Sequence, residues 1–189
     1  MFKGCTSLIN IPALPALELA TYCYWEMFYG CTSLTNLPTI SATKLKQGCC
    51  NSMFEGCTSL TDIPQNYLKS TETASQCYID MFKGCINLTG IPTNLLPATT
   101  LTNSCYYGMF AGCTSLTSVP ALPAVNLVNG CYDRMFSGCT ALTSISAEFL
   151  SWGTNTHEYT NYWVQGITTT GTFYKPAELA TIIGVHYIP

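Results

Sequence analysis

The sequence contains few charged residues. Charged side chains make up 9% of its 189 residues, against about a quarter in an average soluble domain. Seven Lys and Arg stand against ten Asp and Glu, which gives a net charge of −3. The basic residues are scattered along the chain, so they form no patch that could neutralise a run of phosphates. The composition therefore argues against nucleic acid as a partner.

Long apolar runs are also missing. No stretch approaches the roughly 20 apolar residues that cross a bilayer, so we expect no membrane insertion by this segment. The start of the chain lacks the basic and then apolar pattern of a signal peptide. Because the chain begins in the middle of a repeat, we expect that the native protein continues upstream of residue 1. Any targeting signal would then lie outside this fragment.

Motifs that carry catalysis are absent as well. The two histidines, His157 and His186, have no Cys, Asp or Ser partners at motif spacing, and a structural role explains them better. The carboxylates are isolated, and there is no nucleophile elbow, phosphate-binding Gly loop or dinucleotide fingerprint. Cys50 is the one candidate for a reactive nucleophile. We therefore expect a non-enzymatic protein with no catalytic residue, no metal and no cofactor.

A repeat fills most of the sequence. Met-Phe recurs at residues 1, 27, 53, 81, 109 and 135, in steps of 26, 26, 28, 28 and 26. Each pair is followed by x-Gly-Cys, then by Leu three residues later, and by Ile, Leu or Val after three more. Pro follows directly in five of the six units, and Ser146 replaces it in the last. Such a period predicts stacked coils, because a single unit cannot bury its apolar stripe without neighbours.

The spacing within one unit predicts its local structure. Leu127, Cys131 and Met135 lie four apart, which places them on one face of a short helix. Gly138 is expected to end this helix in the left-handed conformation. Leu142 then begins a short strand, which Pro ends in the other units. The predicted fold class is α/β, a solenoid with short parallel β-strands on one face and short helices on the other.

The period divides the chain into two parts. Residues 1–146 form the repeat array of six turns, the first of them truncated. Residues 147–189 lose the period and are rich in aromatic residues, and we expect a small β-rich C-terminal cap that covers the last turn.

The repeated motif resembles a known family. The segments MFYGCTSLTNLP (27–38), MFEGCTSLTDIP (53–64) and MFAGCTSLTSVP (109–120) are similar to the BspA-like leucine-rich repeats of bacterial surface proteins. The segment 159–175 resembles one that often follows such arrays. The resemblance implies a curved leucine-rich-repeat solenoid with a parallel sheet, an extracellular or cell-surface location, and adhesion to host proteins, matrix or other cells.

The twelve cysteines follow the repeat. Zinc sites normally use a spacing of roughly two to four residues, or His together with Cys, and neither pattern occurs. Disulfides within each turn and ladders of buried free thiols both remain open. The ten that we assign a structural role form pairs eight residues apart: Cys23 and Cys31, Cys49 and Cys57, Cys77 and Cys85, Cys105 and Cys113, Cys131 and Cys139.

Candidate binding residues come from two sets. Small polar residues flank the repeat prolines and would line the sheet face, although a tightly curved sheet also explains them; we select Asn36, Asp62 and Gln65. Aromatic residues lie on or near the predicted helices, and Tyr and Trp favour interfaces. Four of the tyrosines share one repeat position, for which packing is the better explanation: Tyr24, Tyr78, Tyr106 and Tyr132. Trp25, Tyr29 and Tyr107 are not fixed by the repeat, and we expect them to contact a partner.

The sequence thus predicts a non-enzymatic binding or adhesion module, displayed on the cell surface or outside the cell. Its partner would be a protein or a glycan, including ligands of host origin. The alternative is a structural spacer or assembly element of a larger surface protein or phage tail.

Overall fold

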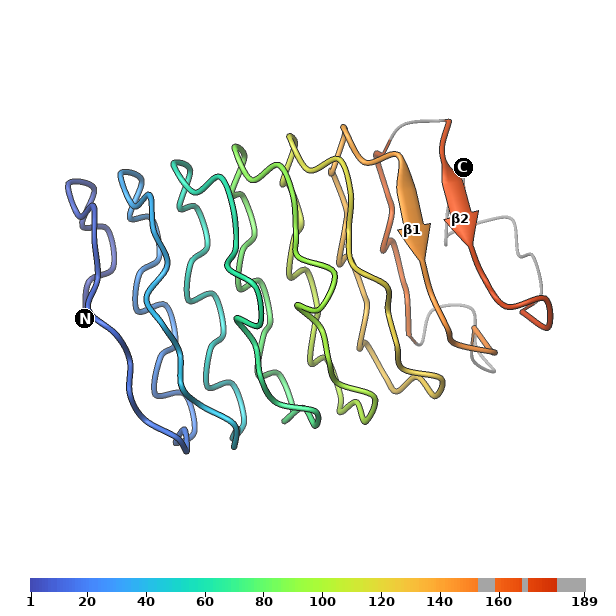
Figure 1. Cartoon of the computed structure of the whole chain (residues 1–189), viewed down its shortest axis with the longest axis horizontal. Coiled ribbons are helices and arrows are strands. Elements are labelled where there is room, and N and C mark those ends of the chain that lie inside the picture. The colour runs from blue at the N-terminus through green and yellow to red at the C-terminus, as the bar shows by residue number, and fades with distance from the viewer. Residues whose placement is uncertain (153–158, 168–169, 180–189) are drawn as a thin grey trace.

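The computed structural model describes residues 1–152, 159–167 and 170–179. The chain forms a row of similar coils stacked side by side, with the N-terminus at one end of the row (Figure 1). The two histidines, whose predicted role is structural, lie outside the described residues. The same holds for part of the predicted C-terminal cap.

The prediction of an α/β fold is wrong. The described residues contain no helix and only two strands, β1 (Ser144–Ser146) and β2 (Thr172–Tyr174). These strands pair in parallel, with Ile145 opposite Phe173, and they lie at the far end of the row from the N-terminus (Figure 1). What was expected to be a helix in each coil is a run of consecutive β-turns.

Left-handed residues prevent the helix. In residues 20–31, Tyr22, Glu26 and Gly30 have φ angles of 53°, 50° and 67°. An α-helix of L-residues cannot pass through such a residue. The left-handed residues recur every fourth position, so the turns share the spacing of four that a helix would show. Gly138 does adopt the expected left-handed conformation, with a φ of 75°, but it belongs to a turn.

The turn segments are residues 20–31 and the equivalent residues of the other coils. In each, the amide N–H groups alternate between two kinds of acceptor. Cys23, Trp25 and Met27 donate to the carbonyl three residues earlier, which closes a turn. The residues at even positions donate to the next coil instead: Tyr22 to Gln47, Tyr24 to Cys49, Glu26 to Asn51, Phe28 to Met53 and Gly30 to Glu55. Five hydrogen bonds of this kind therefore join the two coils along one turn segment.

The extended segments, which run from the repeat Leu to the next turn segment, are joined more sparsely. Between them the structure has isolated parallel bridges, such as Leu14 with Ile40 and Gly90 with Ser118. Pro lacks an N–H group and interrupts a ladder where it occurs. The strand β1 forms in the one coil in which Ser146 replaces the repeat Pro.

Rows of stacked rings fill the core. One Phe from each coil stacks on the next at centroid distances of 5.6 to 6.0 Å with planes within 10° of parallel; the row consists of Phe2, Phe28, Phe54, Phe82, Phe110 and Phe136. A second row joins Tyr78, Tyr106 and Tyr132 at 5.7 and 6.0 Å. Trp163 and Phe149 close the two rows at 6.5 and 6.4 Å, at tilted angles.

The tyrosine row has one gap. Cys50 stands at the position that Tyr24 and Tyr78 occupy in the neighbouring coils. Tyr67, from a coil two residues longer than those before it, is buried beside Phe82 at a centroid distance of 6.4 Å. Burial, and after it the nearby Cys50 thiol, raises the pKa of Tyr67 well above its ordinary value. The larger ring from the longer coil thus occupies core space next to the smaller residue.

Candidate binding surface

The candidate binding residues lie in two kinds of segment. Trp25, Tyr29 and Tyr107 belong to turn segments, whereas Asn36, Asp62 and Gln65 belong to extended segments. The structure therefore does not unite the six into one site.

Trp25 packs against Tyr22, which was not among the predicted binding residues. Its side chain is 56% exposed, and that of Tyr22 is 44% exposed. Their ring centroids are 5.9 Å apart at an interplanar angle of 55°. Together they form an exposed pair of aromatic faces in the same turn segment.

Tyr22 is held in place by the next two coils. A Cβ on Gly48 would lie 2.1 Å from Tyr22 Cε1, so the ring can lie there only because Gly48 has no side chain. The Tyr22 hydroxyl donates to Gln76 Oε1 at 3.5 Å, and Gln47 Nε2 donates to the same oxygen at 3.3 Å. The glycine that follows Tyr22 by one coil is the sequence signal that could have revealed this arrangement.

A groove of about 370 Å³ lies in the residues directly before this pair. Two short stretches of adjacent coils line it: Glu18, Leu19, Ala20, Lys44, Leu45 and Lys46. The Lys44 ammonium donates to the Glu18 carboxylate across the two coils. Both ions are exposed, so this pair contributes little to stability.

The other two predicted aromatic residues are less accessible. Tyr29 is half-buried, and the Lys3 ammonium lies 4.8 Å from its ring centroid. Lys3 also donates to Glu26 at 2.6 Å. Tyr107 occupies the same turn position as Trp25, three coils further along, and is half-buried. These contacts engage Tyr29 within the fold and leave Trp25 as the most exposed of the three.

The predicted polar residues lie along the extended segments. Asn36 Nδ2 donates to Asn10 Oδ1 at 3.3 Å in the neighbouring coil. Asp62 accepts from the Thr61 hydroxyl at 3.2 Å. Gln65 lines a pocket of about 280 Å³ between residues 37–40 and 64–69. The next residue, Asn66, accepts from Asn94 Nδ2 at 2.6 Å, which ties the two longer coils together.

All twelve cysteines are free thiols. Five of the six Cys residues that follow a repeat Gly donate their S–H to the carbonyl of the Phe in the preceding coil: Cys31 to Phe2, Cys57 to Phe28, Cys85 to Phe54, Cys113 to Phe82 and Cys139 to Phe110, at 3.1 to 3.3 Å. Burial raises the pKa of Cys57 and of Cys139 to about 12. These thiols are therefore protonated at neutral pH and act as hydrogen-bond donors within the fold.

Cys50, the one candidate nucleophile, is buried. Its hydrogen bond with the Cys49 thiol, and then its burial, raise its pKa well above the ordinary value. A thiol must ionise to attack, so the site disfavours nucleophilic chemistry. Within the described residues, no group of three or more His, Cys, Asp or Glu could hold a metal ion.

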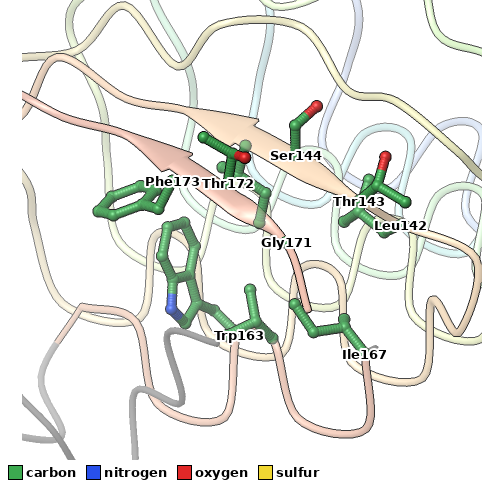
Figure 2. Close-up of a pocket in the computed structure, with 10 residues that line it drawn as sticks. Leu142, Thr143, Ser144, Trp163, Ile167, Gly171, Thr172 and Phe173 are labelled. Atoms are coloured by element: carbon green, nitrogen blue, oxygen red, sulfur yellow. The ribbon is translucent and has the colours of Figure 1, made fainter. Parts of the chain in front are cut away.

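A small cavity lies at the end of the row of coils. It has a volume of about 20 Å³ and lies between the paired strands and residues 163–167. Figure 2 shows Trp163 and Ile167 below β1 and β2 at this cavity. Its volume is about that of one water molecule, which makes it a packing void. In the described part of the chain there is no helix long and apolar enough to cross a membrane.

The repeat is matched by a family model, "BspA type Leucine rich repeat region", in six copies over residues 1–109 and 66–170. The chain belongs to this family. The resemblance seen in the sequence is thereby confirmed. BspA-type repeats typically occur in bacterial surface proteins, and leucine-rich repeats generally bind proteins without catalysing reactions. No curated protein and no solved structure matched the chain.

Proposed function

We propose that this BspA-type chain is a non-enzymatic binding module that acts at the cell surface or outside the cell. The observation that carries the proposal is the BspA-type repeat, whose stacked coils present the exposed Tyr22–Trp25 pair. Exposed Tyr and Trp side chains are typical anchors of interfaces, because they offer a broad apolar face at a low cost in conformational entropy. The partner is a protein or a glycan.

A binding assay tests the proposal. The purified chain is applied to immobilised glycoproteins, matrix proteins and glycans, and saturable binding is measured. We expect Trp25→Ala to weaken binding by roughly tenfold or more, in the range of an interface anchor. Tyr107→Ala is the matched control at the same turn position, and we expect a smaller loss. Failure to bind any of these surfaces would count against the proposal.

A second candidate is an assembly element of a larger structure. Two large apolar residues of the first extended segment are strongly exposed: Ile9 and Leu17. Exposed apolar surface of this kind favours association with a neighbour. Sedimentation analysis separates the candidates, since an assembly element would form oligomers, whereas a binding module would remain monomeric and bind its ligand.

A further inference from the structure

We infer that an extended peptide segment of a partner protein pairs with the main chain of Ile40, in the pocket between the second coil (27–52) and the third (53–80). This inference rests on the proposed function and names a site inside the array together with the class of partner that it takes. Three observations carry it: an interruption of the bonds between extended segments, main-chain groups left open at that place, and the pocket beside them.

The extended segments separate at one junction between coils. Between residues 34–46 and 60–74, all of which the structure describes, no main-chain hydrogen bond is formed. The turn segments of the same two coils keep all five of their bonds, so the interruption is local to the extended side. Every other pair of neighbouring coils in the described residues has at least one bridge or ladder: Leu14 with Ile40, Glu72 with Thr100, Gly90 with Ser118, Leu122 with Ala147, and β1 with β2.

A change in coil length accompanies this interruption. The first two coils have 26 residues each, and the next two have 28 each. Within each of these equal pairs a bridge lies beyond the repeat Pro, from Leu14 to Ile40 in one and from Glu72 to Thr100 in the other. The unequal pair between them has none. The extra residues after Pro64 thus take the third coil out of register with the second.

Ile40 carries the main-chain groups that remain open. The Leu14 N–H donates to the Thr39 carbonyl at 2.8 Å, and the Ser41 N–H donates to the Leu14 carbonyl at 3.2 Å. Successive residues of a strand direct their main-chain groups to opposite neighbours. The N–H and C=O of Ile40 therefore point towards the third coil, where no described residue pairs with them. Ile40 is only 5% exposed, and unpaired main-chain groups with so little access to water are costly.

The pocket beside Ile40 suits one side chain of a bound strand. Its volume is about 280 Å³, and its apolar lining includes Leu37, Pro38 and Pro64. Sites that enclose a whole small molecule start at about 300 Å³. Because side chains alternate along a strand, a peptide that pairs with Ile40 can place one apolar side chain in the pocket and keep the next in solvent.

The open main-chain groups favour a peptide over a glycan. A peptide in the extended conformation offers N–H and C=O groups at the spacing of a ladder, and addition of a strand to open main-chain groups is a common mode of peptide recognition. The strand would supply the bonds that the third coil does not give to Ile40.

A peptide library supplies the probe. Linear random peptides displayed on phage are selected against the full chain, and the selected peptides are synthesised and titrated. We expect Thr39→Trp, at an exposed residue of the pocket, to weaken the binding of a selected peptide by roughly tenfold or more, because the larger side chain fills the pocket. Thr93→Trp makes the same change at the same repeat position outside the pocket. It should leave the affinity within about twofold.

Main-chain pairing is tested on the peptide and on the protein. N-methylation of a peptide amide removes one donor and leaves the side chains unchanged. Along the peptide its effect should alternate, with a loss of roughly fivefold or more where the amide pairs and little change at the next residue. Hydrogen exchange of the Ile40 amide, followed by NMR, should slow in the complex. The Ser41 amide, which already donates to Leu14, is the internal control.

The results separate this inference from the proposed function. Equal affinity of the selected peptides for Thr39→Trp and Thr93→Trp would overturn the inference, as would an N-methyl scan without alternation or unchanged exchange of the Ile40 amide. Selection of no peptide would overturn it too. In all these cases, saturable binding of the chain to glycoproteins, matrix proteins or glycans would leave the proposed function standing. Absence of that binding as well would remove both.

Discussion

The two sides of each coil are built differently. Along the turn segments, five main-chain hydrogen bonds join a coil to the next, for example from residues 22–30 to residues 47–55. Along the extended segments of the described residues the connections are isolated bridges, apart from the ladder of β1 and β2. The Phe residues of the stacked row and the cysteines that donate hydrogen bonds both belong to the turn segments.

This difference explains where the repeat can vary. The two coils of 28 residues carry their extra residues between the repeat Pro and the next turn segment. All five bonds between turn segments, from residues 48–56 to residues 75–83, are nevertheless present across the first of these longer coils. Because the hydrogen bonds between turn segments hold the coils together, the extended segments can change in length at a small entropic cost.

High pH should act on the turn side most strongly. Unfolded thiols ionise near their ordinary pKa of about 8.5, whereas burial holds the pKa of Cys57 and Cys139 at about 12. Each buried thiol contributes fully to the free energy of unfolding below pH 8.5, and this contribution is lost as the pH rises towards 12. We expect the free energy of unfolding to fall by about 1.4 kcal/mol per pH unit for each such thiol. Urea unfolding between pH 8 and 10.5 measures the slope.

A matched variant isolates one thiol. Cys57→Ala should reduce this slope by about 1.4 kcal/mol per pH unit. A free energy of unfolding that stays constant from pH 8.5 to 10.5 would show that the thiols are not buried as described.

Removal of a ring from the Phe row should have the next largest effect. Phe82 is fully buried between Phe54 and Phe110. We expect Phe82→Ala to lower the free energy of unfolding by about 3–5 kcal/mol, because it creates a cavity. Ile86→Ala, at a side chain in the same coil that is 43% exposed, should cost less than about 0.5 kcal/mol. Similar losses for the two variants in urea unfolding would contradict the description of the core.

Substitution of two glycines in one coil compares a turn segment directly with an extended segment. Gly84, in a turn segment, has a φ of 70°, and a Cβ there would meet only an ordinary contact at 3.8 Å. Gly84→Ala should therefore cost about 1–2 kcal/mol, from the left-handed conformation alone.

Gly90 is the matched control in an extended segment. It has no left-handed φ, and a Cβ there would meet nothing within 4 Å. Gly90→Ala should be neutral or stabilise the protein by up to about 1 kcal/mol, since it restricts the unfolded chain. Thermal unfolding of both variants gives the comparison, and an equal loss at both positions would break it.

The smallest effect is expected on the extended side. The Thr89 hydroxyl donates to the Thr61 carbonyl at 3.3 Å, at an exposed position. Thr89→Val keeps the shape and removes this bond, so it should cost no more than about 0.5–1 kcal/mol. A loss above 2 kcal/mol in urea unfolding would mean that the extended segments contribute more cohesion than their sparse bonds indicate.

The sequence predicted the repeat and its family, but not the local structure of the turn segments. Leu, Cys and Met at a spacing of four fit a helix, and they fit equally well a run of turns with a left-handed residue at every fourth position. Non-glycine residues such as Tyr22 and Glu26 in that conformation give no signal in a single sequence. The stacking of coils fixes them, because their N–H groups donate to the next coil.

The effect of the repeat proline on strand formation could have been predicted more precisely. The repeat Pro is missing at Ser146, and Ser146 belongs to β1, one of the two strands of the described residues. Within the candidate surface, Trp25 was predicted, but its partner Tyr22 depends on Gly48 and Gln76 in two later coils. Such a contact becomes visible only when the coils are stacked in register.

The hydrogen bonds between turn segments all point the same way. The peptide unit of Met27 and Phe28 accepts from Phe2 and donates to Met53, and the unit of Met53 and Phe54 passes the pattern on. Continuous chains of polarised peptide groups thus run along the axis of the stack. Their dipoles add, as they do in an α-helix, but with the opposite relation to chain direction. The end that holds residue 1 carries the carbonyl oxygens and partial negative charge, and the opposite end carries the amide hydrogens and partial positive charge.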